Sequence, residues 1–241
     1  MENAIEVKDL VLRYRILNKM SIRKSLFKMK KSKTEVFEAI RGISFQVEKG
    51  QIMGIVGKNG SGKSTLLKTL SGIFSPDEGS VDLHGHSVSL LSIGVGFQKD
   101  LTGRENIYLS GMLLGFSEQQ VAELIDEIIE FSELGKFIDR PVRTYSSGMY
   151  SKLAFSITST LKTDIMLIDE VLSVGDAKFK KKSYARMKEL ISDKERTVII
   201  VSHNSDTIRK LCDSVLWMHE GQIKMQGEPE TVMQAYEEFM S

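Results

Sequence analysis

GIVGKNGSGKST, residues 54–65, contains the pattern G-x-x-x-x-G-K-S between Gly57 and Ser64. An apolar run at 52–56 precedes the pattern and is typical of a buried parallel strand, and residues 65–70 after it are typical of a helix. A glycine-rich turn between a strand and a helix lets backbone N–H groups approach phosphate oxygens, and the helix N-terminus adds partial positive charge. The pattern therefore predicts a phosphate-binding loop in an α/β fold. The alternative, a glycine-rich turn with a chance Lys-Ser pair, is disfavoured by the flanking elements.

The residues of this loop have distinct expected roles. Lys63 would reach the β- and γ-phosphates of a nucleoside triphosphate, and the hydroxyl of Ser64 would hold Mg²⁺. The predicted cofactors are ATP and Mg²⁺. We expect the following residues to surround the nucleotide: Gly57, Lys58, Asn59, Gly60, Ser61, Gly62, Lys63, Ser64 and Thr65.

A pair of carboxylates follows another apolar run, at 165–168. Asp169 and Glu170 would stand at the carboxyl end of a buried strand, where α/β sheets bind ligands. Asp169 would hold Mg²⁺, directly or through water, and Glu170 would orient and deprotonate the attacking water. Alone, the pair is equally well explained as a cap for the next helix. Together with the phosphate loop it indicates a hydrolytic site.

The remaining pattern predicts the surroundings of these motifs. Apolar runs at 165–168, 197–201 and 214–218 alternate with helix-like segments, which favours a parallel sheet with right-handed crossovers. Residues 101–161 are helical in pattern, and Ser117 with Gln120 forms a capping box. We therefore expect a helical subdomain inserted into an α/β core.

Composition limits the class of protein. The chain has 241 residues, of which 41% are hydrophobic and 27% charged, values of an ordinary soluble globular protein. No apolar run approaches the roughly 20 residues that span a bilayer, so we expect the chain to stay in the cytoplasm unless something holds it at a membrane. The single cysteine, Cys212, excludes an internal disulfide.

A basic segment interrupts the first pair of strands. Between Leu10 and Thr34 there are nine cations and no acidic residue: Arg13, Arg15, Lys19, Arg23, Lys24, Lys28, Lys30, Lys31 and Lys33. The insertion at 15–34 could face anionic lipids or a diphosphate head group, at about 1 kcal/mol per cation near a charged bilayer. A solvated basic loop is the alternative.

A further motif carries a family resemblance. Tyr145-Ser146-Ser147-Gly148-Met149 is similar to the signature LSGGQ, opens a helix predicted at 152–161, and precedes the aspartate-glutamate strand. With the phosphate loop, it makes the whole chain resemble the nucleotide-binding subunit of ABC transporters. The resemblance implies one ATP-binding domain over 1–241: a P-loop NTPase core of parallel strands, an antiparallel β subdomain and a helical subdomain at 101–161. It also implies that Ser146, Ser147 and Gly148 meet ATP held by a second copy.

The resemblance assigns roles to four more residues. Gln98 is similar to the glutamine that senses Mg²⁺ and the γ-phosphate, and His203 to the switch histidine that contacts the γ-phosphate. Asp176 ends a segment that resembles the loop crossing the dimer interface. Tyr14 fits the aromatic that stacks on adenine, although an ordinary core aromatic is nearly as good an interpretation. A histidine at a strand end is by itself more often structural.

Departures from the general pattern point to a subgroup. Tyr145 and Met149 stand where most cassettes have Leu and Gln, and Ser147 replaces the first glycine of the signature. With residues 101–107 and 169–176, they resemble the subgroup that exports cell-envelope polysaccharides, teichoic acids or O-antigens. Because the chain ends at Ser241, we expect no carbohydrate-binding domain, and the wall teichoic acid exporter ATPase is the most similar type.

This subgroup implies partners and a location. The expected partners are two copies of an integral membrane permease, a second copy of the chain, and a polyprenyl-diphosphate-linked polymer reached through the permease. The expected location is peripheral, on the cytoplasmic face of the membrane. A soluble ABC ATPase acting on nucleic acid or ribosomes is an alternative of another class. One compact cassette without sustained heptads disfavours it, so no nucleic acid partner is expected.

Overall fold

The computed structural model describes residues 2–16, 35–91, 96–169 and 175–240. The basic insertion, apart from its first residues, lies outside this range, as does Glu170. The elements follow one another in the order β1 (Asn3–Ile16), β2 (Glu35–Glu48), β3 (Ile52–Val56), α2 (Lys63–Leu70), β4 (Glu78–Asp82), β5 (Val88–Leu91), α3 (Gly103–Leu113), α4 (Glu118–Ser132), η1 (Gly135–Asp139), η2 (Val142–Thr144), α5 (Ser147–Thr160), β6 (Ile165–Ile168), α6 (Ala177–Ile191), β7 (Thr197–Val201), α7 (Ser205–Leu211), β8 (Ser214–His219), β9 (Gln222–Gly227) and α8 (Pro229–Met240).

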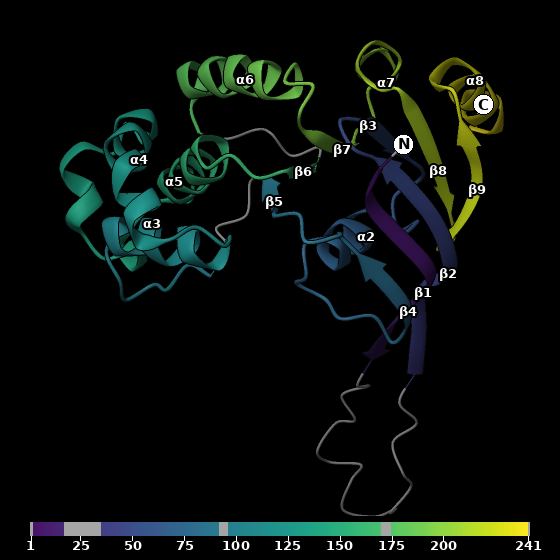
Figure 1. The fold of residues 1–241 in the computed structure, drawn as a ribbon, viewed down its shortest axis with the longest axis horizontal. Helices are drawn as coiled ribbons and strands as arrows, with labels where there is room; N and C mark the ends of the chain where they lie inside the picture. Colours follow the sequence, from purple (N-terminus) through teal and green to yellow (C-terminus); the bar gives the residue numbers. More distant parts are fainter. Residues whose placement is uncertain (1, 17–34, 92–95, 170–174, 241) are drawn as a thin grey trace, which may run out of the picture.

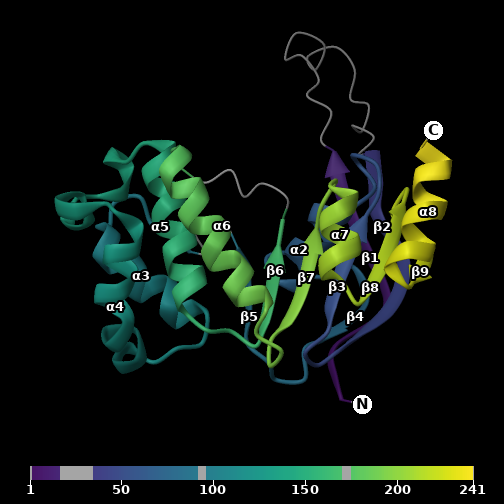
Figure 2. The same cartoon turned by 90° about the horizontal axis from the view of Figure 1, so that it is seen from above.

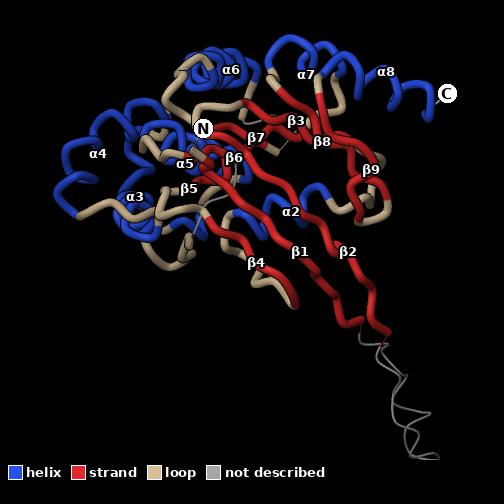
Figure 3. The backbone as a smooth tube through the Cα atoms, turned by 45° about the vertical axis from the view of Figure 1, so that its right-hand side comes forward, coloured by secondary structure: helices blue, strands red, loops and turns tan. Residues whose placement is uncertain are grey.

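The central sheet has the strand order β5-β6-β7-β3-β8-β9. All neighbours in it are parallel except β8 and β9, which pair antiparallel. Helices α6, α7 and α8 cover one face of this sheet, while α2 and the second sheet lie on the other (Figure 1, Figure 3). Every residue of β6 and β7 is buried, as expected for strands covered on both faces. The predicted α/β fold with a parallel core is confirmed.

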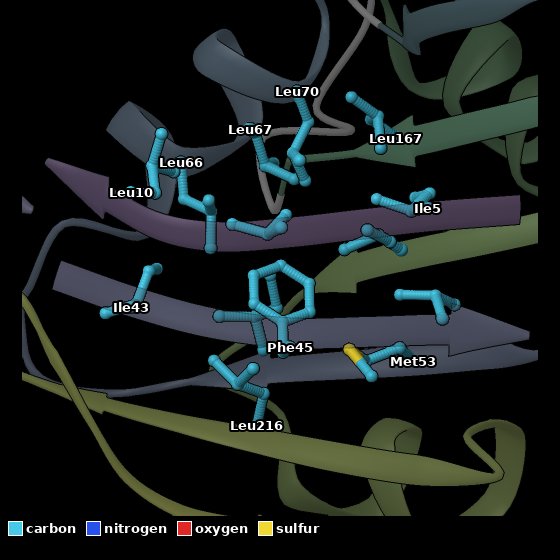
Figure 4. Close-up of a cluster of buried hydrophobic side chains, with 14 of the residues drawn as sticks. Ile5, Leu10, Ile43, Phe45, Met53, Leu66, Leu67, Leu70, Leu167 and Leu216 are labelled. Carbon is cyan, nitrogen blue, oxygen red and sulfur yellow. The ribbon is translucent and has the colours of Figure 1, made fainter. Parts of the chain in front are cut away.

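The second sheet is antiparallel, with the order β2-β1-β4. Its inner face packs on the central sheet and on α2, as the labelled side chains of Figure 4 show. Ile5 and Phe45 from this sheet belong to the same buried cluster as Met53 of β3 and Leu67 of α2. This packing holds α2, and with it the end of the phosphate loop, against both sheets.

Helices α3, α4 and α5 form a lobe beside the central sheet (Figure 2). The lobe has its own apolar cluster, which includes Ile107 of α3, Val121 of α4 and Leu153 of α5. Helix α4 begins at the predicted capping box, in which Ser117 and Gln120 bond each other's backbone N–H groups. The division into a helical subdomain at 101–161 and a basic insertion at 15–34 stays a prediction.

Candidate nucleotide-binding site

The phosphate loop, residues 57–62, joins the end of β3 to the start of α2. Two of its glycines have positive φ and no room for a side chain. At Gly57 (φ 153°) a Cβ would meet the carbonyl oxygen of Met218 and lie 2.6 Å from Ser61 Oγ. At Gly62 (φ 104°) it would lie 2.7 Å from the carbonyl oxygen of Ala39. Only glycine therefore allows this loop to pass so close to β2 and β8.

Three features of this loop fit a polyphosphate. The buried side chain of Lys63 curls over the loop, and its Nζ donates to the carbonyl oxygens of Gly57 at 2.7 Å and Lys58 at 3.0 Å. No side chain caps the N-terminus of α2. Ser61 Oγ is buried, and no described residue bonds it. A buried cation, an uncapped helix N-terminus and an unpaired hydroxyl match the oxygens of a phosphate chain.

A cavity of about 360 Å³ opens over this loop. Its walls come from five separate parts of the sequence: β1, β2, the phosphate loop with α2, and the segments after β6 and β7. It is lined by Tyr14, Phe37, Ala39, Asn59, Gly60, Gly62, Lys63, Ser64, Thr65, Asp169, Val201 and His203. The cavity thus brings together six of the nine residues expected around the nucleotide at residues 57–65 with Tyr14, Asp169 and His203. Gly57, Lys58 and Ser61 do not line it.

The metal-binding candidates of this cavity are oxygen donors. Ser64 and Asp169 both line it. A hydroxyl and a carboxylate fit Mg²⁺, because Mg²⁺ prefers oxygen ligands and takes its remaining ligands from water or phosphate. Within the described ranges, no group of three or more His, Cys, Asp or Glu side chains could hold a metal ion. The residues present therefore suit a cation that shares its coordination with a bound phosphate chain.

Two exposed aromatic rings line the cavity. Tyr14 and Phe37 face each other across β1 and β2, and both line the cavity. The Tyr14 hydroxyl lies 3.2 Å from Thr65 Oγ1, and its ring makes an edge contact with Phe74 at 5.9 Å between centroids. Tyr14 is 36% exposed, so it is not an ordinary core aromatic. The sequence interpretation missed Phe37, because only the strand register brings it opposite Tyr14.

Two of the three predicted signature residues line a different cavity of the same chain, and Ser147 lines neither cavity. Ser146, Gly148 and Asp176 line a cavity of about 400 Å³ together with Lys152, and none of these residues lines the cavity over the phosphate loop. Helix α5 begins at Ser147, five residues earlier than predicted, because Ser146 Oγ caps it by accepting a hydrogen bond from the Met149 N–H at 3.2 Å. The signature turn is therefore the N-terminus of the helix itself.

An ion pair ties this turn to the predicted interface loop. Lys152 Nζ lies 2.7 Å from Asp176 Oδ2, and Asp176 also caps α6 by accepting from the Phe179 N–H. The Lys152 ammonium, and then the Phe179 N–H, lower the pKa of Asp176 to about 2. Sequence reasoning did not assign Lys152 a role, although its place four residues after Gly148 puts it one turn along the same helix face.

Two predicted site residues remain, Gln98 and Glu170, and the structure describes only the first of them. Gln98 is exposed and does not line the cavity; its backbone is held by Asn106 of α3. Glu170 lies outside the described residues. The catalytic and binding roles expected from the sequence stay predictions for all of these residues.

Comparisons with known proteins give the family. The ABC transporter family model matches residues 40–173. The O-antigen export system ATP-binding protein RfbB of Klebsiella pneumoniae is 45% identical over 84% of this chain and 82% of the relative. The RfbB protein of Myxococcus xanthus is 46% identical over 84% of this chain, and the teichoic acids export ATP-binding protein TagH of Bacillus anthracis is 40% identical over 100% of it. The chain spans less than half the length of these last two relatives, 46% and 43%.

The fold has solved counterparts. The ATP-binding cassette MJ0796, in a dimeric post-hydrolysis state bound to ADP and Pi, is similar with a TM-score of 0.68 over 93% of this chain and 98% of that one, at 19% sequence identity. The cbiO1 protein from Clostridium perfringens is similar with a TM-score of 0.61 over 98% and 93%, also at 19% identity. At these identities the likeness shows the fold alone. The family match and the closer relatives show that the chain belongs to the ABC transporter family.

Proposed function

We propose that this chain is the ATP-hydrolysing subunit of an exporter that moves a polyprenyl-diphosphate-linked cell-envelope polymer, wall teichoic acid, across the cytoplasmic membrane. One observation carries the ATPase part: a single cavity gathers Lys63 from the start of α2 with Asp169 and His203, which follow β6 and β7. The relatives named for O-antigen or teichoic acids export support the polymer class. O-antigen or capsular polysaccharide is the second candidate substrate.

In the proposed reaction, Lys63 binds the β- and γ-phosphates of ATP and Tyr14 stacks on the adenine. Glu170 accepts a proton from the water that attacks the γ-phosphorus, and the bond to the β-phosphate oxygen breaks, so that ADP and phosphate leave. His203 contacts the γ-phosphate. Ser64, Asp169 and Gln98 would hold Mg²⁺, which neutralises charge that develops on the phosphate oxygens.

The reaction centre in this proposal is shared by two copies of the chain. Within one chain the signature residues Ser146 and Gly148 line a different cavity from the one over the phosphate loop, which supports a site in which a second copy presents them to the nucleotide. The exposed N-terminus of α5 suits a γ-phosphate, because its backbone N–H groups and dipole attract negative charge. Asp176, paired with Lys152 beside this turn, would lie at the interface.

The membrane partner completes the proposal. No helix in the described parts of the chain is long and apolar enough to cross a bilayer. We propose that two copies of the chain dock on two copies of an integral membrane permease at the cytoplasmic face. The basic insertion at 15–34 would then face anionic lipid or the diphosphate head group of the substrate.

The test pairs the chain with a permease in lipid vesicles that contain a polyprenyl-diphosphate-linked teichoic acid polymer. We expect ATP-dependent movement of the polymer and co-purification with the permease. Glu170→Gln should keep ATP binding and lower turnover by about 10²- to 10⁴-fold, the usual contribution of a positioned general base. Glu123→Gln, an exposed change on α4, is the matched control and should leave turnover unchanged. Undiminished hydrolysis in Glu170→Gln would remove Glu170 from the role, and co-purification with RNA or DNA in place of the permease would favour the soluble alternative.

A further inference from the structure

One buried side chain holds the backbone of Gln98. Asn106, in the first turn of α3, is 0% exposed. Its Oδ1 accepts a hydrogen bond from the Gln98 N–H at 2.7 Å, and its Nδ2 donates to the Gln98 carbonyl oxygen at 3.0 Å. Nδ2 also lies 2.8 Å from the carbonyl oxygen of Thr102 and 3.3 Å from that of Leu101. Both backbone groups of Gln98 are therefore joined to the start of α3 by one amide.

The orientation of this amide is set by its surroundings. The Nδ2 group faces three carbonyl oxygens and the Oδ1 atom faces an N–H donor, so a reversed amide would place oxygen against oxygen. Helix α3 itself begins at a complete capping box, in which Thr102 and Glu105 bond each other's backbone N–H groups. Asn106 thus links Gln98 to a well-defined helix end.

The same loop is bonded to the segment that leads into the signature. The Arg143 N–H donates to the carbonyl oxygen of Lys99 at 2.8 Å, and the Val142 N–H donates to that of Leu101 at 2.9 Å. Ser146 follows Arg143 by three positions and is the first signature residue that we predict to contact a nucleotide. Residues 98–103 and 140–143 are therefore joined by hydrogen bonds, and Asn106 attaches Gln98 to this unit. The Tyr145 N–H bonds back to the Val142 carbonyl oxygen at 3.0 Å, which connects the unit to the signature turn.

We propose that Asn106 is a positioning residue that makes Gln98 move together with α3 and the signature turn. Gln98 serves the nucleotide held by its own chain, whereas the signature turn serves the nucleotide held by the partner copy. When the helical lobe shifts, the unit changes both contacts at once, so the two composite sites respond together. This inference rests on the proposed function, because it uses the expected Mg²⁺ and signature contacts.

The test uses Asn106→Asp, which keeps the shape and replaces the Nδ2 donor with a carboxylate oxygen facing three carbonyls. We expect faster amide hydrogen exchange across residues 98–103, a lower kcat, and a rise in the Mg²⁺ concentration for half-maximal ATPase activity by about 2- to 30-fold, the usual range of a coupling residue. In a Gln98→Ala background the same change should not alter the Mg²⁺ requirement further.

Ser132→Ala is the matched control. Ser132 is also 0% exposed in the helical lobe, and its Oγ bonds the Ile129 carbonyl oxygen and the Leu134 N–H, far from Gln98 in sequence. It should lower lobe stability without changing the Mg²⁺ requirement. Three results would each overturn the inference. They are unchanged hydrogen exchange at 98–103 in Asn106→Asp, multiplicative effects of the two changes on the Mg²⁺ requirement in the double variant, and an equal shift of the Mg²⁺ requirement in Ser132→Ala. If the wild-type chain hydrolyses no ATP, the proposed function fails, and exchange at 98–103 alone then decides whether Asn106 holds Gln98.

Discussion

Replacing Tyr14 with alanine should weaken ATP binding while sparing the binding of inorganic tripolyphosphate. Tyr14 lines the cavity beside the phosphate loop and is already oriented by two contacts, the Thr65 hydroxyl and the Phe74 ring. A ring held in place loses little freedom when a base stacks on it. Stacking of a base on an aromatic ring is worth about 1–3 kcal/mol, which corresponds to a rise in Kd of about 5- to 150-fold. Tripolyphosphate carries no base, so its Kd should stay within a factor of two or so of the wild-type value.

Two further variants separate the parts of this effect. Tyr14→Phe keeps the ring and loses the hydrogen bond of the hydroxyl. A protein hydrogen bond contributes roughly 0.5–1.5 kcal/mol, and we expect the low end because the site is partly exposed, so the Kd for ATP should rise only about twofold. Phe37→Ala removes the more exposed of the two rings, since Phe37 is 47% exposed and Tyr14 is 36% exposed. It should therefore weaken ATP binding less than Tyr14→Ala does. Calorimetric titration with ATP and with tripolyphosphate measures all three. Equal losses of affinity for the two ligands in Tyr14→Ala would refute stacking. A larger loss of ATP affinity in Phe37→Ala than in Tyr14→Ala would assign the stacking role to Phe37.

Other predictions follow from the same geometry. Lys63→Ala should weaken ATP and tripolyphosphate alike, since Lys63 lines the cavity over the phosphate loop; a titration that shows intact tripolyphosphate binding would contradict its phosphate role. Burial raises the pKa of the Cys212 thiol to about 12, so the folded chain should resist iodoacetamide at pH 8 and react once unfolded in urea; rapid labelling of the folded chain would show that the site opens. The pKa of Asp176 falls from 3.8 to about 2 on folding, so its carboxylate stabilises the fold fully above pH 5 and progressively less as the pH falls towards 2. The gap between the urea midpoints of wild type and Asp176→Asn should therefore narrow as the pH falls from 5 towards 2, and a constant gap would mean that folding does not lower the pKa of Asp176.

Local features of the chain were accessible from the sequence because they depend on neighbouring residues. The phosphate loop is contiguous, so Gly57 to Ser64 indicated its strand, turn and helix together. The capping box of Ser117 and Gln120 needs only three positions of spacing. The start of α5 was placed five residues too late, because the polar and small residues after Ser146 carry no apolar stripe, and only the cap shows that they are helical.

Contacts between distant segments depended on tertiary structure. Strand β7 lies between β6 and β3 in the sheet, and this order places Asp169 and His203 in the same cavity as Lys63. The order itself is set by which strands pair, a property of backbone hydrogen bonds that leaves no mark in any one strand's sequence. The pairing of Tyr14 with Phe37 depends on register in the same way.

The sequence by itself determined the class of fold and the strand, turn and helix around the phosphate loop, because buried strands and a glycine-rich turn are encoded over a few adjacent residues. The tertiary structure alone decided that the signature turn faces a cavity separate from the phosphate loop, since α5 belongs to a lobe with its own apolar core. It also decided that Asn106 and Lys152 hold the predicted site loops, because each contact joins segments that only packing brings together.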